Sequence, residues 1–349
     1  MTPLHGLKVL ELARVLAGPW AGQVLADMGA DVVKVEGPEG DETRNWGPPF
    51  APDGAAAYYH AANRGKRDVS ADFRNADDLA MVKALAARAD VVIENFKLGG
   101  LKQFGLDYDS FGQTGPYAPR AGYDFIIQAM GGIMDLTGEP DGEAQKPGMA
   151  YADLFTGLYS VIGIQAALAQ RAVTGKGQHI DMALFDTQLA VLANQSGNYL
   201  TSGIVPRRMG NAHPNIVPYQ VFQAADAPFV IACGNDHQFA HLCEKLGVAF
   251  HTDARFARNT DRVKNRQIII PLLAAEMARH SRADILALME AAGVPAGPIN
   301  TVAEALADPQ ALARGMVQDH GQTRSVRLPI VFSGADMPLP AAAPQKDAH

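Results

Sequence analysis

Cysteine is scarce in this sequence of 349 residues, with only Cys233 and Cys243 present. Two thiols cannot form a disulfide framework or supply the four ligands of a structural zinc site. We therefore expect two buried, reduced thiols and no bound metal ion. A reducing, cytoplasmic location is also expected.

Positive charge is not in excess either. The 30 Lys and Arg residues face 37 Asp and Glu residues, which gives a formal net charge of −7. Because nucleic acids and anionic membranes are bound through basic surfaces, neither is an expected partner. An anionic ligand must instead meet a local cluster of basic side chains.

Long apolar runs and common nucleotide motifs are absent as well. No stretch reaches the ~18 uninterrupted apolar residues of a membrane span. The N-terminal "MTPLHGLKVLEL" lacks the pattern of a secretory signal. G-x-G-x-x-G, P-loop, H-E-x-x-H and G-x-S-x-G patterns do not occur, so the signal for a dinucleotide-dependent oxidoreductase is missing. With 48% hydrophobic and 19% charged residues, the composition is typical of a soluble globular enzyme of about two domains.

Short apolar strands alternate with helical patterns in the first hundred residues. Gly29 ends the first helix, and Asn75 or Asp77 is expected to cap the second. Strand, helix and strand in repetition predict an α/β fold with a doubly wound, Rossmann-like parallel sheet. The predicted elements are strands at 8–12, 31–36 and 90–96 and helices at 18–29 and 75–89.

The remaining sequence predicts more helix and a second, smaller α+β domain. Helices are predicted at 123–132, 153–171 and 185–200, strands at 177–184 and 227–234, and mostly helix over 255–314. We expect a large Rossmann-like domain over 1–200, a small domain over 201–320, and a return segment over 321–349 with a loose tail from 337. The roughly 25 residues between 96 and 123 contain no apolar run, although a doubly wound sheet is expected to place a strand there.

Four basic residues cluster in "NRGKRDVSADFR", namely Arg64, Lys66, Arg67 and Arg74. On a loop after a strand of a parallel sheet, they would face the crevice where ligands bind, and guanidinium groups match phosphate oxygens well. A solvated surface run is the alternative, and from the residues alone it is favoured.

Asp153 stands directly before a long apolar helical run. Aspartate is a common helix N-cap, where free backbone N–H groups and the helix dipole keep it ionised. The same position would present an exposed anionic oxygen that can attack an activated acyl group. From the residues alone, the cap is the favoured interpretation.

Two glycine-containing turns, "GNAHPNIVPYQ" and "CGNDHQ", contain His213 and His237. Their small residues and free amides could close over a reactive intermediate. No second carboxylate or cysteine lies at a useful spacing, so a metal site is not expected there.

Many phrases of the sequence together resemble the class III, formyl-CoA-transferase-type CoA-transferases. Among them are "LKVLELARVLAGPWAGQVLADMGADVVKVE", "NRGKRDV", "FGQTGPYAPRAGYD", "YADLFTGLYSVIGIQAALAQRAVTGKGQHIDMAL" and "GVPAGPINTVAEAL". The resemblance covers residues 4 to 333. It implies that Asp153 is the catalytic nucleophile, which forms an aspartyl anhydride and then an aspartyl-CoA thioester with coenzyme A. It also implies an interlocked homodimer.

The resemblance further implies two groups of binding residues. Coenzyme A would be bound by Leu16, Ala17, Ala71, Asp72, Arg74, Asn95, Phe96, Lys97, Lys102, Gln103, Gly122, Tyr123 and Asp124. The acyl group would lie against Asn215, Ile216, Val217, Asn235, Asp236 and His237.

Three departures from the family pattern refine these expectations. Formyl-specific relatives have a run of glycines where this chain reads "HPNIVP", so another carboxylate is expected. The phrases "TRNWGPPF" and "VPYQVF" resemble members that use dicarboxylic acids, such as succinyl-CoA with glutarate. Racemases of the same fold have a histidine where this chain has Tyr123, a poor base with an ordinary pKa near ~10, so transfer is expected over racemisation. Relatives also carry about fifteen more residues between Ser110 and Phe111 and a final helix, and without them a CoA-binding protein with impaired catalysis is the third alternative.

Overall fold

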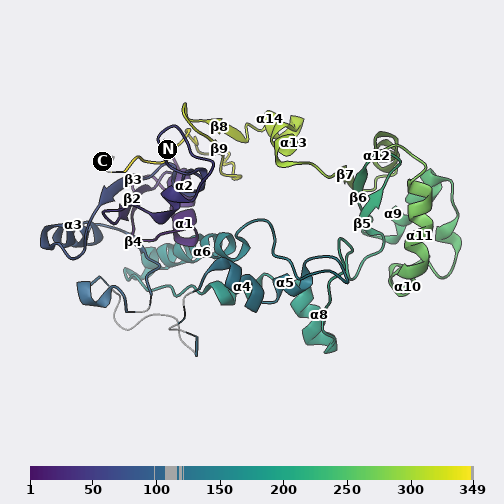
Figure 1. Ribbon diagram of the computed structural model, residues 1–349, viewed down its shortest axis with the longest axis horizontal. Coiled ribbons are helices and arrows are strands. Elements are labelled where there is room, and N and C mark those ends of the chain that lie inside the picture. Colours follow the sequence, from purple (N-terminus) through teal and green to yellow (C-terminus); the bar gives the residue numbers. More distant parts are fainter. Residues whose placement is uncertain (98, 107–115, 118–119, 121, 347–349) are drawn as a thin grey trace. The chain divides into compact units, whose positions relative to one another are not determined.

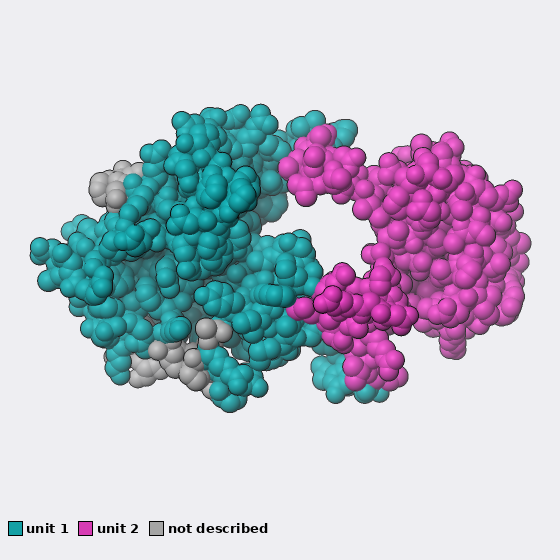
Figure 2. All heavy atoms as spheres, viewed as in Figure 1, with its two compact units in different colours: residues 1–133, 146–203, 308–349 teal, residues 134–145, 204–307 magenta. Residues whose placement is uncertain are grey.

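The computed structural model describes residues 1–97, 99–106, 116–117, 120 and 122–346. The chain divides into two compact units, which are coloured separately in Figure 2. Unit 1 comprises Met1–Ile133, Lys146–Gly203 and Asp308–His349, and unit 2 comprises Met134–Gln145 and Ile204–Ala307. These units are groups of residues in contact, and the functional domain boundaries at 200 and 320 remain a prediction.

A four-stranded parallel sheet forms the centre of unit 1 (Figure 1). Its strands are β1 (Lys8–Glu11), β2 (Asp31–Glu36), β3 (Arg67–Ser70) and β4 (Val91–Ile93), in the order β3-β2-β1-β4. The predicted parallel sheet is therefore confirmed. The sequence missed β3, because "RDVS" contains a single apolar residue and resembles a polar loop.

Apolar side chains alternate between the two faces of this sheet. Val9 and Val32 pack against α1 (Ala17–Asp27) and α6 (Tyr151–Thr174), whereas Leu10 and Val33 lie on the opposite face with Val82 of α3 (Ala76–Ala86). Strands buried on both faces are typical of a sheet covered by helices on each side. Asn75 caps α3, since its side chain accepts hydrogen bonds from two backbone N–H groups of that helix.

The remaining elements of unit 1 are shorter. They are α2 (Ala57–Asn63), α4 (Asp124–Met130), α7 (Leu184–Ala190), α8 (Asn194–Ser202), α14 (Pro309–Ala313), the 3-10 turns η1 (Glu42–Asn45) and η2 (Lys102–Phe104), and the hairpin β8 (Val317–Asp319) with β9 (Arg324–Val326). The short α5 (Ile133–Leu136) crosses the boundary between the units.

Helix α6 packs closely on α1, as Figure 1 shows. Gly157 of α6 lies so near α1 that an added Cβ would be 2.7 Å from the carbonyl oxygen of Ala17 and 3.1 Å from the Trp20 ring. By length and composition, α6 is apolar enough to cross a membrane, with a mean hydropathy of 1.3. In this fold it packs against α1, α4 and α7.

Three predictions about unit 1 are wrong. No strand forms at 177–184, because an extended segment becomes a strand only with a hydrogen-bonded neighbour, and none pairs with it among the described residues. The helix predicted at 185–200 is split into α7 and α8, since Ala193 has φ of +47° and cannot continue an α-helix. The tail after residue 337 is not loose: the N–H of Gly65 donates to the carbonyl of Ala341, and Arg44 donates to that of Pro344.

Unit 2 contains a three-stranded antiparallel sheet, β5 (Tyr219–Gln223), β6 (Pro228–Ala232) and β7 (Ala296–Pro298), in that order. Its helices are α9 (Asp236–Leu246), α10 (Asn259–Lys264), α11 (Arg266–Met277), α12 (Arg282–Ala291) and α13 (Val302–Ala307), with the 3-10 turn η3 (Phe250–Thr252). The predicted strand at 227–234 and the helical content of 255–314 are confirmed.

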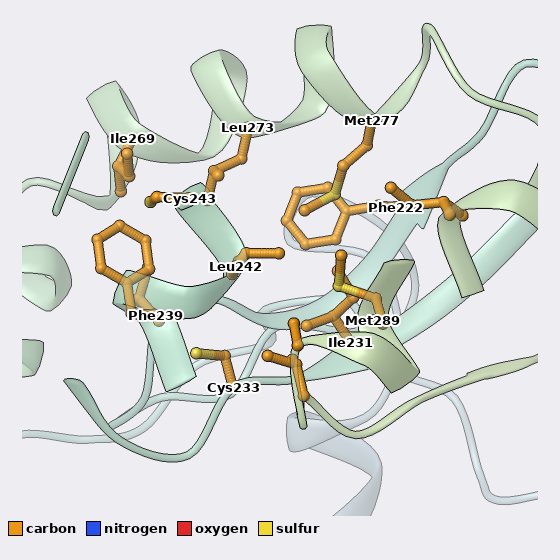
Figure 3. Packing of buried hydrophobic residues seen from close by; sticks show 14 of the residues in the cluster. Phe222, Ile231, Cys233, Phe239, Leu242, Cys243, Ile269, Leu273, Met277 and Met289 are labelled. Atoms are coloured by element: carbon orange, nitrogen blue, oxygen red, sulfur yellow. The ribbon is translucent and has the colours of Figure 1, made fainter. Parts of the chain in front are cut away.

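The core of unit 2 lies between this sheet and its helices (Figure 3). Phe222 and Ile231 of the sheet pack with Leu242 of α9 and Leu273 of α11. Cys233 and Cys243 are both free and buried here, as expected. Burial raises the pKa of Cys233 to about 12 and that of Cys243 to about 11, so both remain unreactive thiols at neutral pH.

Replacing Gly157 by Ala should destabilise the fold, because the new methyl group meets the backbone of Ala17. Overpacking of this kind costs about 1–3 kcal/mol. The matched control is Gly197→Ala in α8, where nothing lies within 4 Å, and the better helix propensity of Ala should stabilise by roughly 0.5–1 kcal/mol. Urea unfolding would measure both free energies, and equal stabilisation by the two changes would contradict the close α1–α6 contact.

Candidate active site

Asp153 lies in the first turn of α6 but does not cap it. The N-cap position is Ala150, whose side chain makes no capping hydrogen bond. Asp124, the first residue of α4, accepts from the N–H of Ala152 at 2.8 Å and from the N–H of Asp153 at 3.3 Å. The capping interpretation of Asp153 is therefore wrong, because another helix supplies the cap.

The Asp153 carboxyl is buried, with 8% of the residue exposed. Burial raises its pKa from 3.8 to about 7, and the neighbouring Asp124 carboxyl contributes in the same direction. We expected an exposed oxygen that the helix dipole keeps ionised. Desolvation instead outweighs the dipole, and the carboxyl ionises near neutral pH.

Tyr58 of α2 faces this pair of carboxyls. Burial, together with the repulsion of a phenolate by Asp153 and Asp124, raises the pKa of Tyr58 to about 12. The phenol therefore stays protonated. Its ring lies 5.3 Å from that of Trp46. Tyr58 was not identified from the sequence.

Such an arrangement suits nucleophilic catalysis. Among the residues that the structure describes, no donor hydrogen-bonds the Asp153 carboxyl oxygens, so their lone pairs are not engaged. A carboxyl with a pKa near 7 is also more basic, and hence more nucleophilic, than an ordinary aspartate.

The thirteen residues predicted to bind coenzyme A all belong to unit 1. Three groups of them follow strand ends: Leu16 and Ala17 come after β1, Ala71, Asp72 and Arg74 after β3, and Asn95, Phe96 and Lys97 after β4. Since parallel strands end at the same edge of the sheet, these loops share one edge.

Direct contacts join these three loops. Asn95 accepts from the N–H of Arg14 at 2.9 Å and donates to its carbonyl at 2.7 Å. The Arg14 guanidinium lies 5.7 Å from the Phe96 ring, whose centre is 6.2 Å from that of Phe73 beside Arg74. The loops after β1, β3 and β4 are thus brought together as expected.

The other predicted residues of this group lie on further segments. Lys102 and Gln103 are exposed in η2, and Gly122 and Tyr123 are exposed immediately before α4. Asp124 is the cap of α6 described above. The predicted gap between Ser110 and Phe111 lies outside the described residues.

The basic cluster is engaged in ion pairs within the chain. Arg64 is buried against Asp27 at 2.9 Å, and Lys66 is buried against Glu11 at 2.8 Å. Neither side chain faces a crevice, so the phosphate interpretation and the surface interpretation are both wrong for these two. Arg67 and Arg74 are exposed and pair with Asp31 and Asp72.

Two buried lysines hold the loop between β1 and α1. Lys34 donates to the carbonyl of Ala13 at 2.9 Å, and Lys66 donates to that of Pro19 at 2.8 Å. Both also pair with Glu11. Their contacts flank the segment that contains Leu16 and Ala17. The position of Lys34 within the apolar strand "DVVKVE" was the feature of the sequence that could have indicated a buried lysine here.

The six predicted acyl-binding residues belong to unit 2, and a polar network connects their two loops. Arg262, which is fully buried, donates to the carbonyl of Val217 and to the carboxylate of Asp236. Asn259 donates from its backbone to Asp236 and from its side chain to the carbonyl of Asn215. The sequence did not identify Asn259 or Arg262.

Several of these six residues make contacts that stabilise the fold of unit 2. The Val217 side chain is buried in the core of unit 2. Asn235 caps α9 by accepting from the N–H of Gln238 at 2.9 Å, and the His237 ring packs at a tilt against that of His241, with 4.1 Å between the ring centres. Contact with an acyl group remains a prediction for the set. Within the described part of the chain, no cluster of His, Cys, Asp and Glu could hold a metal ion.

The model of CoA-transferase family III matches residues 4–349. The chain therefore belongs to this family, and it is a CoA-transferase, for which coenzyme A is a substrate.

Named relatives include a succinate–glutarate CoA-transferase of Agrobacterium fabrum strain C58. It is 51% identical over 374 aligned positions, which cover 99% of this chain and 94% of the relative. The succinyl-CoA:glutarate CoA-transferase of Homo sapiens is 40% identical, with 91% of this chain and 76% of the relative covered. The first alignment is longer than this chain, so that relative contains segments that this chain lacks.

Solved structures agree with the fold. A CAIB/BAIF family protein from Brucella suis matches with a TM-score of 0.88 and 58% identity, over 100% of this chain and 97% of that one. Rv3272 from Mycobacterium tuberculosis matches with a TM-score of 0.89 and 26% identity, over 100% and 98%.

Asp153→Asn should change how stability depends on pH. In the unfolded chain this carboxyl ionises near pH 3.8, whereas in the folded protein it ionises near pH 7. Folding stability is therefore lost as the pH rises between these values, by on the order of 4 kcal/mol. From pH 4 to pH 8, the Asn variant should therefore become more stable relative to the parent protein.

Urea unfolding across this pH range measures the effect. Asp186→Asn in the first turn of α7 is the control, because this exposed carboxyl is hydrated in both states. A difference that is independent of pH for Asp153→Asn would contradict the raised pKa.

Proposed function

We propose that this protein transfers coenzyme A from succinyl-CoA to a dicarboxylate acceptor such as glutarate, with Asp153 as the covalent nucleophile. The observation that carries the proposal is the buried Asp153 carboxyl, which has a raised pKa and no hydrogen-bond donor among the described residues. The names of the relatives from Agrobacterium fabrum and Homo sapiens support the choice of acids. The same names favour transfer over racemisation.

The reaction begins when an Asp153 carboxylate oxygen attacks the thioester carbon of succinyl-CoA. The C–S bond breaks, CoA departs as a thiolate, and a mixed anhydride joins Asp153 to succinate. The thiolate then attacks the Asp153 carbonyl carbon, which expels succinate and leaves an aspartyl-CoA thioester. Glutarate attacks this thioester, and the same two steps in reverse yield glutaryl-CoA and free Asp153.

Several features would serve this chemistry. The loops after β1, β3 and β4 would bind coenzyme A, and the protonated phenol of Tyr58 would be a neighbour of the reacting carboxyl. An anhydride hydrolyses in water, so water must be kept from the reacting carboxyl while the anhydride exists. We further propose that the protein works in the cytoplasm as an interlocked homodimer.

Oxygen labelling tests the covalent role of Asp153. In a single turnover with succinyl-CoA and ¹⁸O-labelled glutarate, one acceptor oxygen should pass into the Asp153 carboxyl, because the anhydride bridge is cleaved on its glutaryl side. Mass spectrometry of the peptide that contains Asp153 should show a gain of one ¹⁸O. Asp153→Ala should abolish transfer and labelling but leave binding of coenzyme A nearly unchanged.

The control for this experiment is Asp186→Asn, which should retain both transfer and labelling. Transfer without ¹⁸O at Asp153, or turnover by Asp153→Ala, would overturn the mechanism. Loss of the α-proton from a 2-methylacyl-CoA in deuterated buffer would favour the racemase instead.

A panel of acceptor acids tests the substrate class. With succinyl-CoA as donor, glutarate should give a kcat/KM at least about tenfold above those for formate and oxalate, since small acids fill less of a site shaped for longer acids. Chromatography of the product thioesters measures each rate. Preference for formate or oxalate would reject the assignment to longer dicarboxylates while leaving the nucleophile in place.

A further inference from the structure

The carboxylate of Asp124 accepts hydrogen bonds from N–H groups at the start of α6. An acidic residue in the first turn of a helix ordinarily interacts with such groups itself. The Oδ1 atom of Asp124 accepts from the N–H of Ala152 at 2.8 Å and from that of Asp153 at 3.3 Å. These are among the free donors that every helix N-terminus offers. We propose that Asp124 is a positioning residue, which caps α6 from α4 and thereby leaves the side chain of the Asp153 nucleophile without a hydrogen bond from the described residues. This proposal rests on the function proposed above.

Gln128 fixes the orientation of Asp124. One helical turn later in α4, its side-chain amide donates to Oδ2 of Asp124 at 2.6 Å and to the carbonyl of Met149 at 3.3 Å. Gln128 is fully buried. Both oxygens of Asp124 are therefore engaged, one with α6 and one with Gln128, and the carboxylate cannot turn away without losing these contacts.

The arrangement also places two like charges side by side. The groups that act on the Asp153 carboxyl are Asp124 from α4, which repels its negative charge, and Tyr58 from α2, which stays neutral. Helix α1 presents Trp20 to α6 at Gly157, and Asp186 of α7 is exposed.

Acylation removes this repulsion. The negative charge of Asp153 moves onto the sulfur of the departing CoA thiolate when the anhydride forms, so the pair of neighbouring anions becomes a single one. Asp124 thus raises the energy of the ionised nucleophile without touching the reacting atoms. An interaction that is relieved in the transition state increases kcat rather than substrate affinity.

Asp124→Asn removes the negative charge but keeps the helix cap, because an amide oxygen can still accept from the N–H groups of Ala152 and Asp153. The pH midpoint for aspartyl-CoA formation should move down by on the order of one pH unit. The maximal rate should fall roughly threefold, because a less basic oxygen is a weaker nucleophile, while KM for succinyl-CoA changes little. Single-turnover experiments across pH 5 to 9 measure both quantities.

A second measurement does not depend on turnover. The effect of Asp153→Asn on unfolding free energy, followed against pH, reports the titration of Asp153 directly. In the Asp124→Asn background its midpoint should shift to lower pH by the same amount as the rate profile. Asp77→Asn, the same change in the exposed first turn of α3, is the control and should shift neither.

Asp124→Ala removes the cap as well as the charge. The Asp153 carboxylate can then accept the vacated N–H groups, so its titration should move further down and the rate should fall more than with Asn. Unchanged midpoints in both variants would overturn the positioning role, as would a rise in KM without a change in kcat. A shifted stability midpoint without any acyl intermediate in the parent protein would instead reject the proposed function and keep the charge coupling.

Discussion

Burial of one carboxyl at the start of α6 is the constraint on which the rest of the site depends. An aspartate in the first turn of a helix is ordinarily stabilised by free N–H groups and by the helix dipole. Here Asp124 takes those groups and burial removes the water, so Asp153 ionises near neutral pH. The fold therefore places the proposed nucleophile where burial and a neighbouring carboxyl destabilise its negative charge.

Close packing makes this burial possible. Gly157 allows α6 to approach α1 closely, at the backbone of Ala17 and the side chain of Trp20. This first turn of α1 lies next to the backbone contacts of Lys34 and Lys66. The segment containing Leu16 and Ala17 and the first turn of α6 are thus fixed by one set of contacts. The buried lysines act on a backbone loop within the protein, which differs from the phosphate-binding role that a basic cluster indicates.

Much of the architecture follows from the sequence, and the two errors about strands share one cause. Residues 8–12, 31–36 and 90–96 were identified as strands because each contains a continuous apolar run. The strand β3 was not predicted, because "RDVS" forms a strand through its pairing with β2 rather than through an apolar pattern of its own. The segment 177–184 has the strand pattern but no paired neighbour among the described residues. Pairing is a property of two segments, so a single segment cannot reveal it.

The family, the parallel sheet and the position of the proposed nucleophile could be predicted from the sequence alone, because these depend on residue types and on their order along the chain. The chemical state of that aspartate and the partners of the charged residues became known only from the folded structure. Asp124 and Asp153 are far apart in sequence, and Arg64 and Lys66 find Asp27 and Glu11 on other elements. Desolvation and Coulomb interactions depend on distance in space, which only the folded chain defines.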